Sequence, residues 1–368
     1  MKPESLDLDT VTEYLVGDAV LIDTSLLLDL DGCSIRLRSN SEALLSRLRH
    51  YFRKVLSEKA STHSDMEVIA IEREALEAEL DYIDWKREAG KKGRKDSYLD
   101  FHGGRLIRKV RTGMVFLQSA ERRIAAGPGL EYDNQLINFI NAQYMNWLQN
   151  RDWLICHAAA LVYHGVALGM AGFSGGGKST LMLHLLEHEA VSYLTNDRLF
   201  ISAQGSVTRA RGIPKLPRIN PGTIVHNPRL QALIPEAERR ELLALPQQEL
   251  WELEDKYDVM VDEVYGPGKL CSTAVPLKHF LVLNWDRKDD APTALHRVDL
   301  AQRRDLLAAI MKSPGPFYQL ADGSFYRDDM PFDEQAYLDQ LRHVTIHEVT
   351  GGVDFDVLTQ LCFSRLLD

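Results

Sequence analysis

GFSGGGKS, residues 172–179, is the stretch of sequence that decides the fold of the second half of the chain. It fits the pattern G-x-x-x-x-G-K-[ST] of a phosphate-binding loop. The residues before it, VALGMA, predict a strand, and those after it, TLMLHLLEH, predict a helix. A glycine-rich turn that binds nothing is the alternative. A strand, the complete motif and a helix in this order favour the phosphate-binding loop, called the glycine loop below.

Each residue type in the glycine loop has a chemical reason to be there. Glycines let backbone N–H groups turn inward without a side-chain clash. Together with the N-terminus of the following helix, these groups form a nest for an anion. We expect Lys178 to neutralise the β- and γ-phosphates of ATP and the Ser179 hydroxyl to ligate Mg²⁺. The predicted nucleotide-binding residues are Gly172, Ser174, Gly175, Gly176, Gly177, Lys178, Ser179 and Thr180.

Asp197 is the candidate for a second metal ligand, because such loops need a carboxylate to hold the metal. It lies in SYLTNDRLFI, on the strand predicted directly after the first helix. A turn residue at the end of a strand is the alternative. Asn196 beside it is a candidate to orient a water or a phosphate, and Arg198 to stack or form a salt bridge. The absence of an LSGGQ-like signature disfavours a transporter-type ATPase.

The block from Cys156 to Ile201 resembles the catalytic core of HPr kinase/phosphorylase and its relatives. It is most similar to the HPr-kinase-related kinases of uncertain substrate, a family whose nucleotide site resembles that of phosphoenolpyruvate carboxykinase. The family has a histidine on the strand before the loop, matched here by His157, and an acidic pair matched in part by Asp197. The resemblance implies that His157 hydrogen-bonds the catalytic carboxylate and tunes its pKa. A buried histidine of the core is the alternative.

Asn196 departs from this pattern, because HPr kinase has the other aspartate at this place. In that family one aspartate of the pair is the base that activates the acceptor serine. Either Asp197 does both jobs here or the acceptor is different. The resemblance does not extend before residue 150, so it does not imply that the acceptor is HPr.

Residues 209–218, RARGIPKLPR, form the basic segment, with four cations among prolines. The prolines exclude a regular helix, so the sequence predicts a loop. Phosphoryl transfer needs positive charge on the migrating group, and a basic loop supplies it in the resembled family. A solvated surface loop is the alternative. The candidates, in order of preference, are Arg211, Lys215, Arg218 and Arg209.

Composition narrows the functional classes. The chain has 368 residues and a formal net charge of −10, which disfavours general binding of nucleic acid or of an anionic membrane. Its N-terminus, MKPESLDLDT, has no apolar signal core. The apolar run 153–173 contains two histidines and ends in glycines, so it predicts a pair of buried strands instead of a membrane span. Four widely spaced cysteines favour a reducing cytoplasm.

The chain is long enough for two domains. Hairpin signals surround Asp31-Gly32 and 102–104, and apolar residues at helical spacing predict a helix over 134–149. Beyond it, short strands alternate with helices. The predicted fold class is α/β, with a P-loop kinase core of the HPr kinase/phosphoenolpyruvate carboxykinase type. An α+β N-terminal domain of unknown role is predicted over 1–145, and the catalytic domain over 146–368.

Three functions compete. The first is a kinase that moves the γ-phosphoryl group of ATP to a hydroxyl of a protein serine or a small molecule, with Mg²⁺. The second is a nucleotide-binding regulatory module or weak ATPase, which Asn196 favours. The third is a carboxykinase-type enzyme, disfavoured because no carboxylate-binding set is recognisable. We expect ATP and an unknown phosphate acceptor as partners, no nucleic acid and no membrane, and a homo-oligomer is compatible with the sequence.

Overall fold

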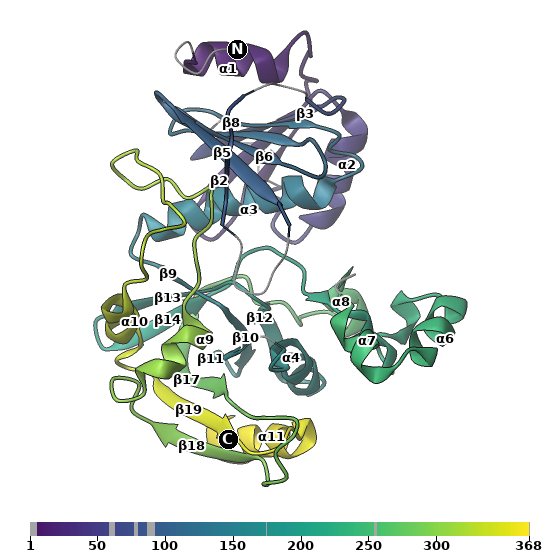
Figure 1. Cartoon of the computed structure of the whole chain (residues 1–368), viewed down its shortest axis with the longest axis vertical. Helices are drawn as coiled ribbons and strands as arrows, with labels where there is room; N and C mark the ends of the chain where they lie inside the picture. Colours follow the sequence, from purple (N-terminus) through teal and green to yellow (C-terminus); the bar gives the residue numbers. More distant parts are fainter. Residues whose placement is uncertain are drawn as a thin grey trace. The chain divides into compact units, whose positions relative to one another are not determined.

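The chain folds into two compact units in the computed structural model (Figure 1). The structure describes residues 6–58, 63–76, 80–86, 93–173, 175–253 and 256–367. The first unit is formed by residues 1–152 and 313–331, and the second by residues 153–312 and 332–368.

The division differs from the predicted one. The expected boundary at 145/146 lies inside one continuous helix, α3 (Asp133–Gln149). This helix belongs to the first unit, where Phe139 packs on Phe116 with ring centroids 5.0 Å apart. Residues 313–331 return to the first unit, where Asn146 donates a hydrogen bond of 2.7 Å to the carbonyl of Phe317. Such a long-range return has no local signal in the sequence.

A mixed sheet forms the body of the first unit. Among the described residues its strand order is β1-β2-β3-β8-β7-β6-β5-β4, and only the β2–β3 and β3–β8 pairs are parallel. Both predicted hairpins are confirmed: Asp31 and Gly32 turn with φ of 53° and 96°, and Gly103 turns with φ of 92°. The helices are α1 (Leu8–Val16), α2 (Glu42–Tyr51) and α3. The strands are β1 (Ser25–Asp29), β2 (Ser34–Ser39), β3 (Met66–Glu72), β4 (Ile83–Asp84), β5 (Asp96–Phe101), β6 (Gly104–Lys109), β7 (Val115–Gln118) and β8 (Arg123–Gly127).

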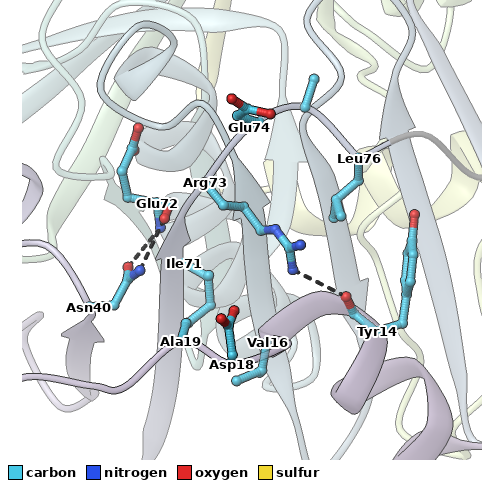
Figure 2. A pocket seen from close by; sticks show the side chains of 11 residues that line it. Tyr14, Val16, Asp18, Ala19, Asn40, Ile71, Glu72, Arg73, Glu74 and Leu76 are labelled. Atoms are coloured by element: carbon cyan, nitrogen blue, oxygen red, sulfur yellow. Dashed lines mark hydrogen bonds between the residues drawn. The ribbon is translucent and has the colours of Figure 1, made fainter.

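A cavity of about 680 Å³ lies beside α1 in the first unit (Figure 2). Two of its polar side chains, those of Asn40 and Arg73, form hydrogen bonds with backbone groups of neighbouring elements. The side-chain amide of Asn40 donates to the Glu72 carbonyl and accepts from the Glu72 N–H, at 3.0 and 2.8 Å. Arg73 donates to the carbonyls of Tyr14 and Leu15, at 3.3 and 3.1 Å, at the end of α1. The Arg73 contacts satisfy carbonyls at the end of α1, where a helix leaves its last carbonyls without partners within the helix.

The second unit is built on another mixed sheet, with the strand order β12-β10-β11-β17-β14-β13-β9 among the described residues. β19 pairs with β17 in parallel and with β18 in antiparallel fashion. The strands are β9 (Leu154–Cys156), β10 (Ala158–Tyr163), β11 (Val166–Gly172), β12 (Val191–Thr195), β13 (Leu199–Gln204), β14 (Val207–Arg211), β15 (Arg218–Ile219), β16 (Tyr257–Asp258), β17 (Val275–Leu283), β18 (Ala294–Val298) and β19 (Thr345–Thr350).

The helices of the second unit are α4 (Lys178–Leu186), α5 (Pro221–Val225), α6 (Glu236–Ala244), α7 (Gln247–Glu252), α8 (Val261–Val264), α9 (Leu307–Ile310), α10 (Glu334–Leu341) and α11 (Phe355–Cys362). Of these, α4 and α11 pack on one face of the sheet, and α9 and α10 pack on the other. Short turns of other helix types occur at Gln231–Leu233, Arg304–Leu306 and Phe363–Leu367. Alternate residues of β10 and β11 face two separate apolar clusters, one containing α4 residues and one containing α9 and α10 residues. Burial on both faces explains why 153–173 is an unbroken apolar run.

The predicted strand pair over this run is confirmed, with a turn at His164 and Gly165. Residue 169, within β11, is a glycine, and a Cβ at this position would come within 2.6 Å of the Phe280 ring. The predicted loop over the basic segment is wrong at its start, because Arg209 and Arg211 lie on β14 and pair with β13. Backbone pairing with β13 makes residues 207–211 a strand, and the prolines come only after it, at 214 and 217. No helix among the described residues is long and apolar enough to cross a membrane.

Candidate functional site

The glycine loop connects the end of β11 to the first residue of α4, as the sequence predicts. Gly175 and Gly177 have φ of 76° and 83°, which glycine adopts without strain. The N–H of Gly176 donates to the carbonyl of Phe173 at 2.9 Å and closes the turn. Ser174 lies outside the described residues. Lys178 and Ser179 therefore occupy the first turn of α4, where helix N–H groups have no partners within the helix.

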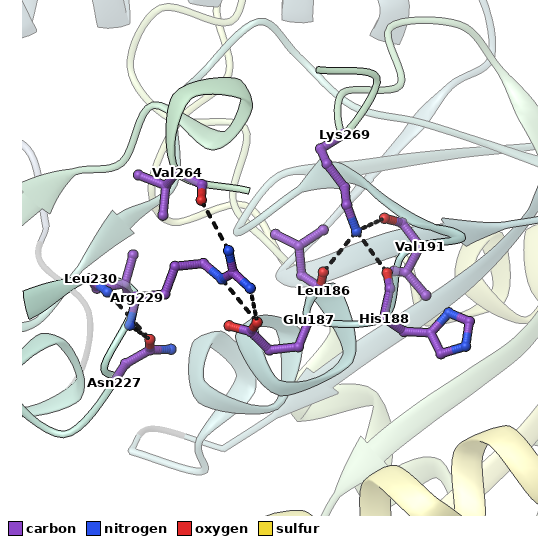
Figure 3. Close-up of polar contacts among 9 residues, drawn as sticks. All are labelled: Leu186, Glu187, His188, Val191, Asn227, Arg229, Leu230, Val264 and Lys269. Atoms are coloured by element: carbon purple, nitrogen blue, oxygen red, sulfur yellow. Dashed lines mark hydrogen bonds and ion pairs between the residues drawn. The ribbon is translucent and has the colours of Figure 1, made fainter. Parts of the chain in front are cut away.

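α4 is anchored at its other end (Figure 3). The ammonium of Lys269, buried in the second unit, donates to the carbonyls of Leu186, His188 and Val191 at 3.0, 2.7 and 3.0 Å. A cation at this place also interacts favourably with the helix dipole. Arg229 forms an ion pair of 2.8 Å with Glu187 at the same end. Both contacts fix the helix that carries Lys178 and Ser179.

A chain of polar contacts runs from the glycine loop to the end of β12. Nζ of Lys178 lies 3.2 Å from Nε2 of His157. This histidine nitrogen in turn lies 3.1 Å from Oδ1 of Asp197. Backbone geometry holds His157 at this place, because its N–H donates to the carbonyl of Ile310 at 2.7 Å. A ring nitrogen carries either a proton or a lone pair. Nε2 therefore either accepts from Lys178 or donates to Asp197, and cannot do both at once.

Lys312 completes this group from the segment after α9. Its Nζ lies 3.0 Å from Oδ2 of Asp197, and its side chain is 16% exposed. Surrounding protein atoms would raise the pKa of Asp197, but Lys312, His157 and Arg198 outweigh this effect and hold the pKa well below its usual value. Asp197 is therefore an ionised carboxylate near neutral pH. The sequence analysis missed Lys312, since neither a motif nor its spacing marks it.

The Ser179 hydroxyl donates to Oδ1 of Asn196 at 2.9 Å. The two residues predicted to share a metal thus have different partners: Ser179 contacts Asn196, whereas Asp197 contacts His157 and Lys312. Thr180 lies 3.4 Å from the hydroxyl of Thr223 on α5. Hydroxyl, amide and carboxylate oxygens are the ligand types that Mg²⁺ accepts. Within the described parts of the chain, no three His, Cys, Asp or Glu side chains gather as a metal cluster.

Positive charge surrounds Asp197. The half-buried Lys215 of the basic segment belongs to this group, and its backbone carbonyl accepts from the Tyr193 hydroxyl at 3.0 Å. Desolvation, together with the charge of Arg198, lowers the pKa of Lys215 well below its usual value, although Asp197 opposes the shift. Asp197 therefore has three basic side chains in its surroundings, Arg198, Lys215 and Lys312, and is linked to a fourth, Lys178, through His157.

The other cations of the basic segment have different surroundings. Arg211 is 8% exposed, and its guanidinium lies 4.9 Å from the centre of the Trp153 ring. Arg209 donates to the carbonyl of Ala274. Arg218 forms an ion pair of 3.3 Å with Asp258. Of the four predicted transfer cations, Lys215 is the one whose pKa is shifted with a contribution from Asp197, which raises it.

Comparisons with known proteins give a likeness to solved structures alone. No family model matches the chain, and no curated protein matches it. Among solved structures, the Hpr(Ser) kinase/phosphatase from Coxiella burnetii aligns with a TM-score of 0.28 and 10% sequence identity. The alignment covers 57% of this chain and 89% of that chain. The likeness is a distant structural relationship.

Proposed function

We propose that the chain is an ATP-dependent kinase that transfers the γ-phosphoryl group to a hydroxyl, either of a protein serine or of a small molecule. The observation that carries the proposal is the contact chain Lys178–His157–Asp197–Lys312 at the mouth of the glycine loop. It combines a phosphate-binding lysine, a proton-handling pair and a further cation. A carboxylate with three basic side chains in its surroundings and a fourth linked through His157 is an arrangement suited to polyanionic phosphates.

The residues present fit a magnesium–nucleotide complex. Gly175 and Gly177 have the positive φ values that an anion nest needs, and Gly177 lies directly before the first turn of α4. Ser179, Asn196 and Asp197 offer only oxygen ligands, which suit Mg²⁺. Of these, Ser179 and Asp197 are the residues we propose to hold the ion. When bound, Mg²⁺ would neutralise charge on the β- and γ-phosphates.

In the proposed step, Asp197 accepts a hydrogen bond from the acceptor hydroxyl and orients its oxygen toward the γ-phosphorus. The bond from this oxygen to phosphorus forms, the bond to the β,γ-bridging oxygen breaks, and ADP leaves. The hydroxyl proton goes to Asp197, and from there to Nε2 of His157 when this nitrogen carries a lone pair. A carboxylate with a low pKa is a weak base, but a loose transition state needs little proton removal before the phosphoryl group moves. Lys178, Lys215 and Lys312 would stabilise charge on the migrating group.

A transfer assay with γ-labelled ATP tests the proposal. The purified chain is incubated with and without cell lysate, and its Lys178→Ala variant serves as the control. We expect label in a lysate component with the wild-type chain and none with the variant. Hydrolysis of ATP without any labelled acceptor would contradict the kinase assignment.

One observation favours a nucleotide-binding regulatory module as the second candidate. Asn196 accepts from Ser179 at the place where an aspartate would add a negative charge. A module of this kind needs nucleotide-dependent binding and no transfer. Tight ATP binding with no turnover in the labelled assay would support it.

A further inference from the structure

The carbonyl of Gly176, inside the glycine loop, accepts a hydrogen bond of 2.9 Å from the indole Nε1 of Trp285. Trp285 lies two residues beyond the end of β17, far from the loop in sequence. The guanidinium of Arg287 makes a longer contact, 3.5 Å, to the carbonyl of Gly175. Two neighbouring carbonyls of the glycine loop therefore face the same outside segment.

The segment that holds Trp285 is itself fixed to β19. The N–H of Asn284 donates to the carbonyl of Val349 at 2.9 Å, and its side chain donates to Glu348 at 2.7 Å. Two residues further on, the N–H of Asp286 donates to the carbonyl of Gly351 at 3.0 Å. The residues before and after Trp285 are thus both hydrogen-bonded to β19 or to the segment directly after it.

A second aromatic ring, that of Phe355, packs against both Trp285 and Gly177. Phe355, the first residue of α11, packs edge-on against Trp285, with ring centroids 5.2 Å apart and planes at 88°. A Cβ on Gly177 would come within 2.7 Å of the Phe355 ring. Asp354 caps α11 by accepting from two N–H groups at 3.0 Å, which fixes the start of this helix. Only a glycine allows the loop to run this close to the ring.

The direction of the Gly176 carbonyl has a consequence for its neighbour. In a planar trans peptide, the carbonyl of one residue and the N–H of the next point in opposite directions. Anchoring the Gly176 carbonyl on Trp285 therefore turns the Gly177 N–H away from Trp285. The last N–H before α4 is one of the groups that an anion nest requires.

We propose that Trp285 and Phe355 are positioning residues that hold the glycine loop in its anion-binding form. The Trp285 indole fixes the orientation of the Gly176–Gly177 peptide, and the Phe355 ring keeps Gly177 against the start of α4. The inference rests on the proposed function for the ligand, a nucleoside triphosphate, but the bracing itself needs no ligand. Neither residue is expected to touch the reacting atoms.

The first test uses hydrogen exchange on the ligand-free full chain. Trp285→Phe keeps a smaller aromatic ring against Phe355 and removes the N–H donor. We expect amides of residues 175–180 to exchange about tenfold faster in this variant, the effect of one lost hydrogen bond. Trp147→Phe, in the first unit, is the matched control and should leave these amides unchanged. Equal exchange in Trp285→Phe and wild type would overturn the bracing role.

The second test is calorimetry with ATP and with inorganic tripolyphosphate. Because Trp285 acts on the phosphate nest, Trp285→Phe should weaken both ligands by the same factor, about tenfold. A loss confined to ATP would mean that Trp285 contacts the base, and would overturn the proposal. If the wild-type chain binds neither ligand, the proposed function fails, and the exchange experiment still decides whether Trp285 braces the loop.

Discussion

Nζ of Lys312 lies 3.0 Å from Oδ2 of Asp197, on the carboxylate oxygen that His157 does not contact. The carboxylate is thereby held from both sides, by a lysine and by an imidazole. An ammonium at this distance favours the ionised form of the carboxylate. Lys312 therefore has a definite task in the proposed kinase, which is to keep Asp197 charged when an acceptor arrives.

We predict that Lys312→Met raises the pKa of Asp197, because the variant removes the cation that most strongly opposes protonation. Protonated Asp197 cannot orient an acceptor, so kcat/KM should begin to fall at a higher pH than in the wild-type chain. Lys312→Arg keeps the charge and should restore the wild-type acid limb. The pH profile of kcat/KM checks this, and an unshifted acid limb in Lys312→Met would contradict it.

Lys178→Ala should weaken ATP binding by about 100-fold, an effect expected for loss of a charged contact to phosphate. Lys178 is half-buried and contacts His157, so we expect its loss to change the melting temperature by only a few degrees. Calorimetry and thermal unfolding on the same sample separate the two effects. Equal ATP affinity in variant and wild type would show that the glycine loop is not a nucleotide site.

Ser179→Ala should raise the Mg²⁺ concentration needed for half-maximal ATP binding by about tenfold, since one oxygen ligand is lost. Asn196→Ala should also raise this concentration, but by less, because Asn196 is not a proposed ligand and acts only through its hydrogen bond with Ser179. Binding of ATP in the presence of a chelator should be equal in all three proteins. A magnesium titration checks this, and overlapping curves would exclude Ser179 from the metal site.

His157→Gln tests the shared nitrogen. Glutamine keeps a hydrogen-bonding group near Lys178 and Asp197 but cannot accept a proton as imidazole does. We expect kcat to fall by about 100-fold, with ATP affinity within about threefold of wild type. The pH profile of kcat should also change shape, because the variant removes the imidazole that contacts Asp197. An identical profile would mean that His157 only fills space in the core.

The sequence predicts the glycine loop and its neighbours well, for local reasons. A complete motif between β11 and α4 requires only near neighbours in the chain, and so do the turn at His164-Gly165 and the helix α3. His157 and Asp197 were also proposed from one continuous block. The structure brings these two side chains within 3.1 Å of each other, whereas the hydrogen bond and their catalytic roles stay predictions.

What the sequence does not predict depends on long-range contacts. Lys312 reaches Asp197 only because the segment after α9 runs past the end of β12. Trp285 reaches the glycine loop because β17 lies beside β11 in the sheet. The basic segment differs, because its departure from the prediction is local. The sequence predicts one loop there, but β14 forms a hairpin with β13, its neighbour in the chain, and this places Arg211 in a strand.

The last prediction separates two cations that the sequence treats alike. Arg211 is 8% exposed and stacks on Trp153, whereas Lys215 lies among the charges around Asp197. Lys215→Ala should therefore leave ATP affinity within a few-fold. It should lower phosphoryl transfer by about 100-fold, on the order of 3 kcal/mol of transition-state stabilisation.

Arg211→Ala, in contrast, should reduce the free energy of unfolding by about 2 kcal/mol, through loss of a desolvated cation–π contact. Any fall in its transfer rate should follow the fraction of folded protein. Single-turnover transfer, calorimetry and denaturant unfolding on both variants distinguish the two roles. A 100-fold loss of transfer in fully folded Arg211→Ala would move the transition-state role to Arg211. Unchanged transfer in both variants would remove the basic segment from catalysis, because Arg209 and Arg218 are engaged with Ala274 and Asp258.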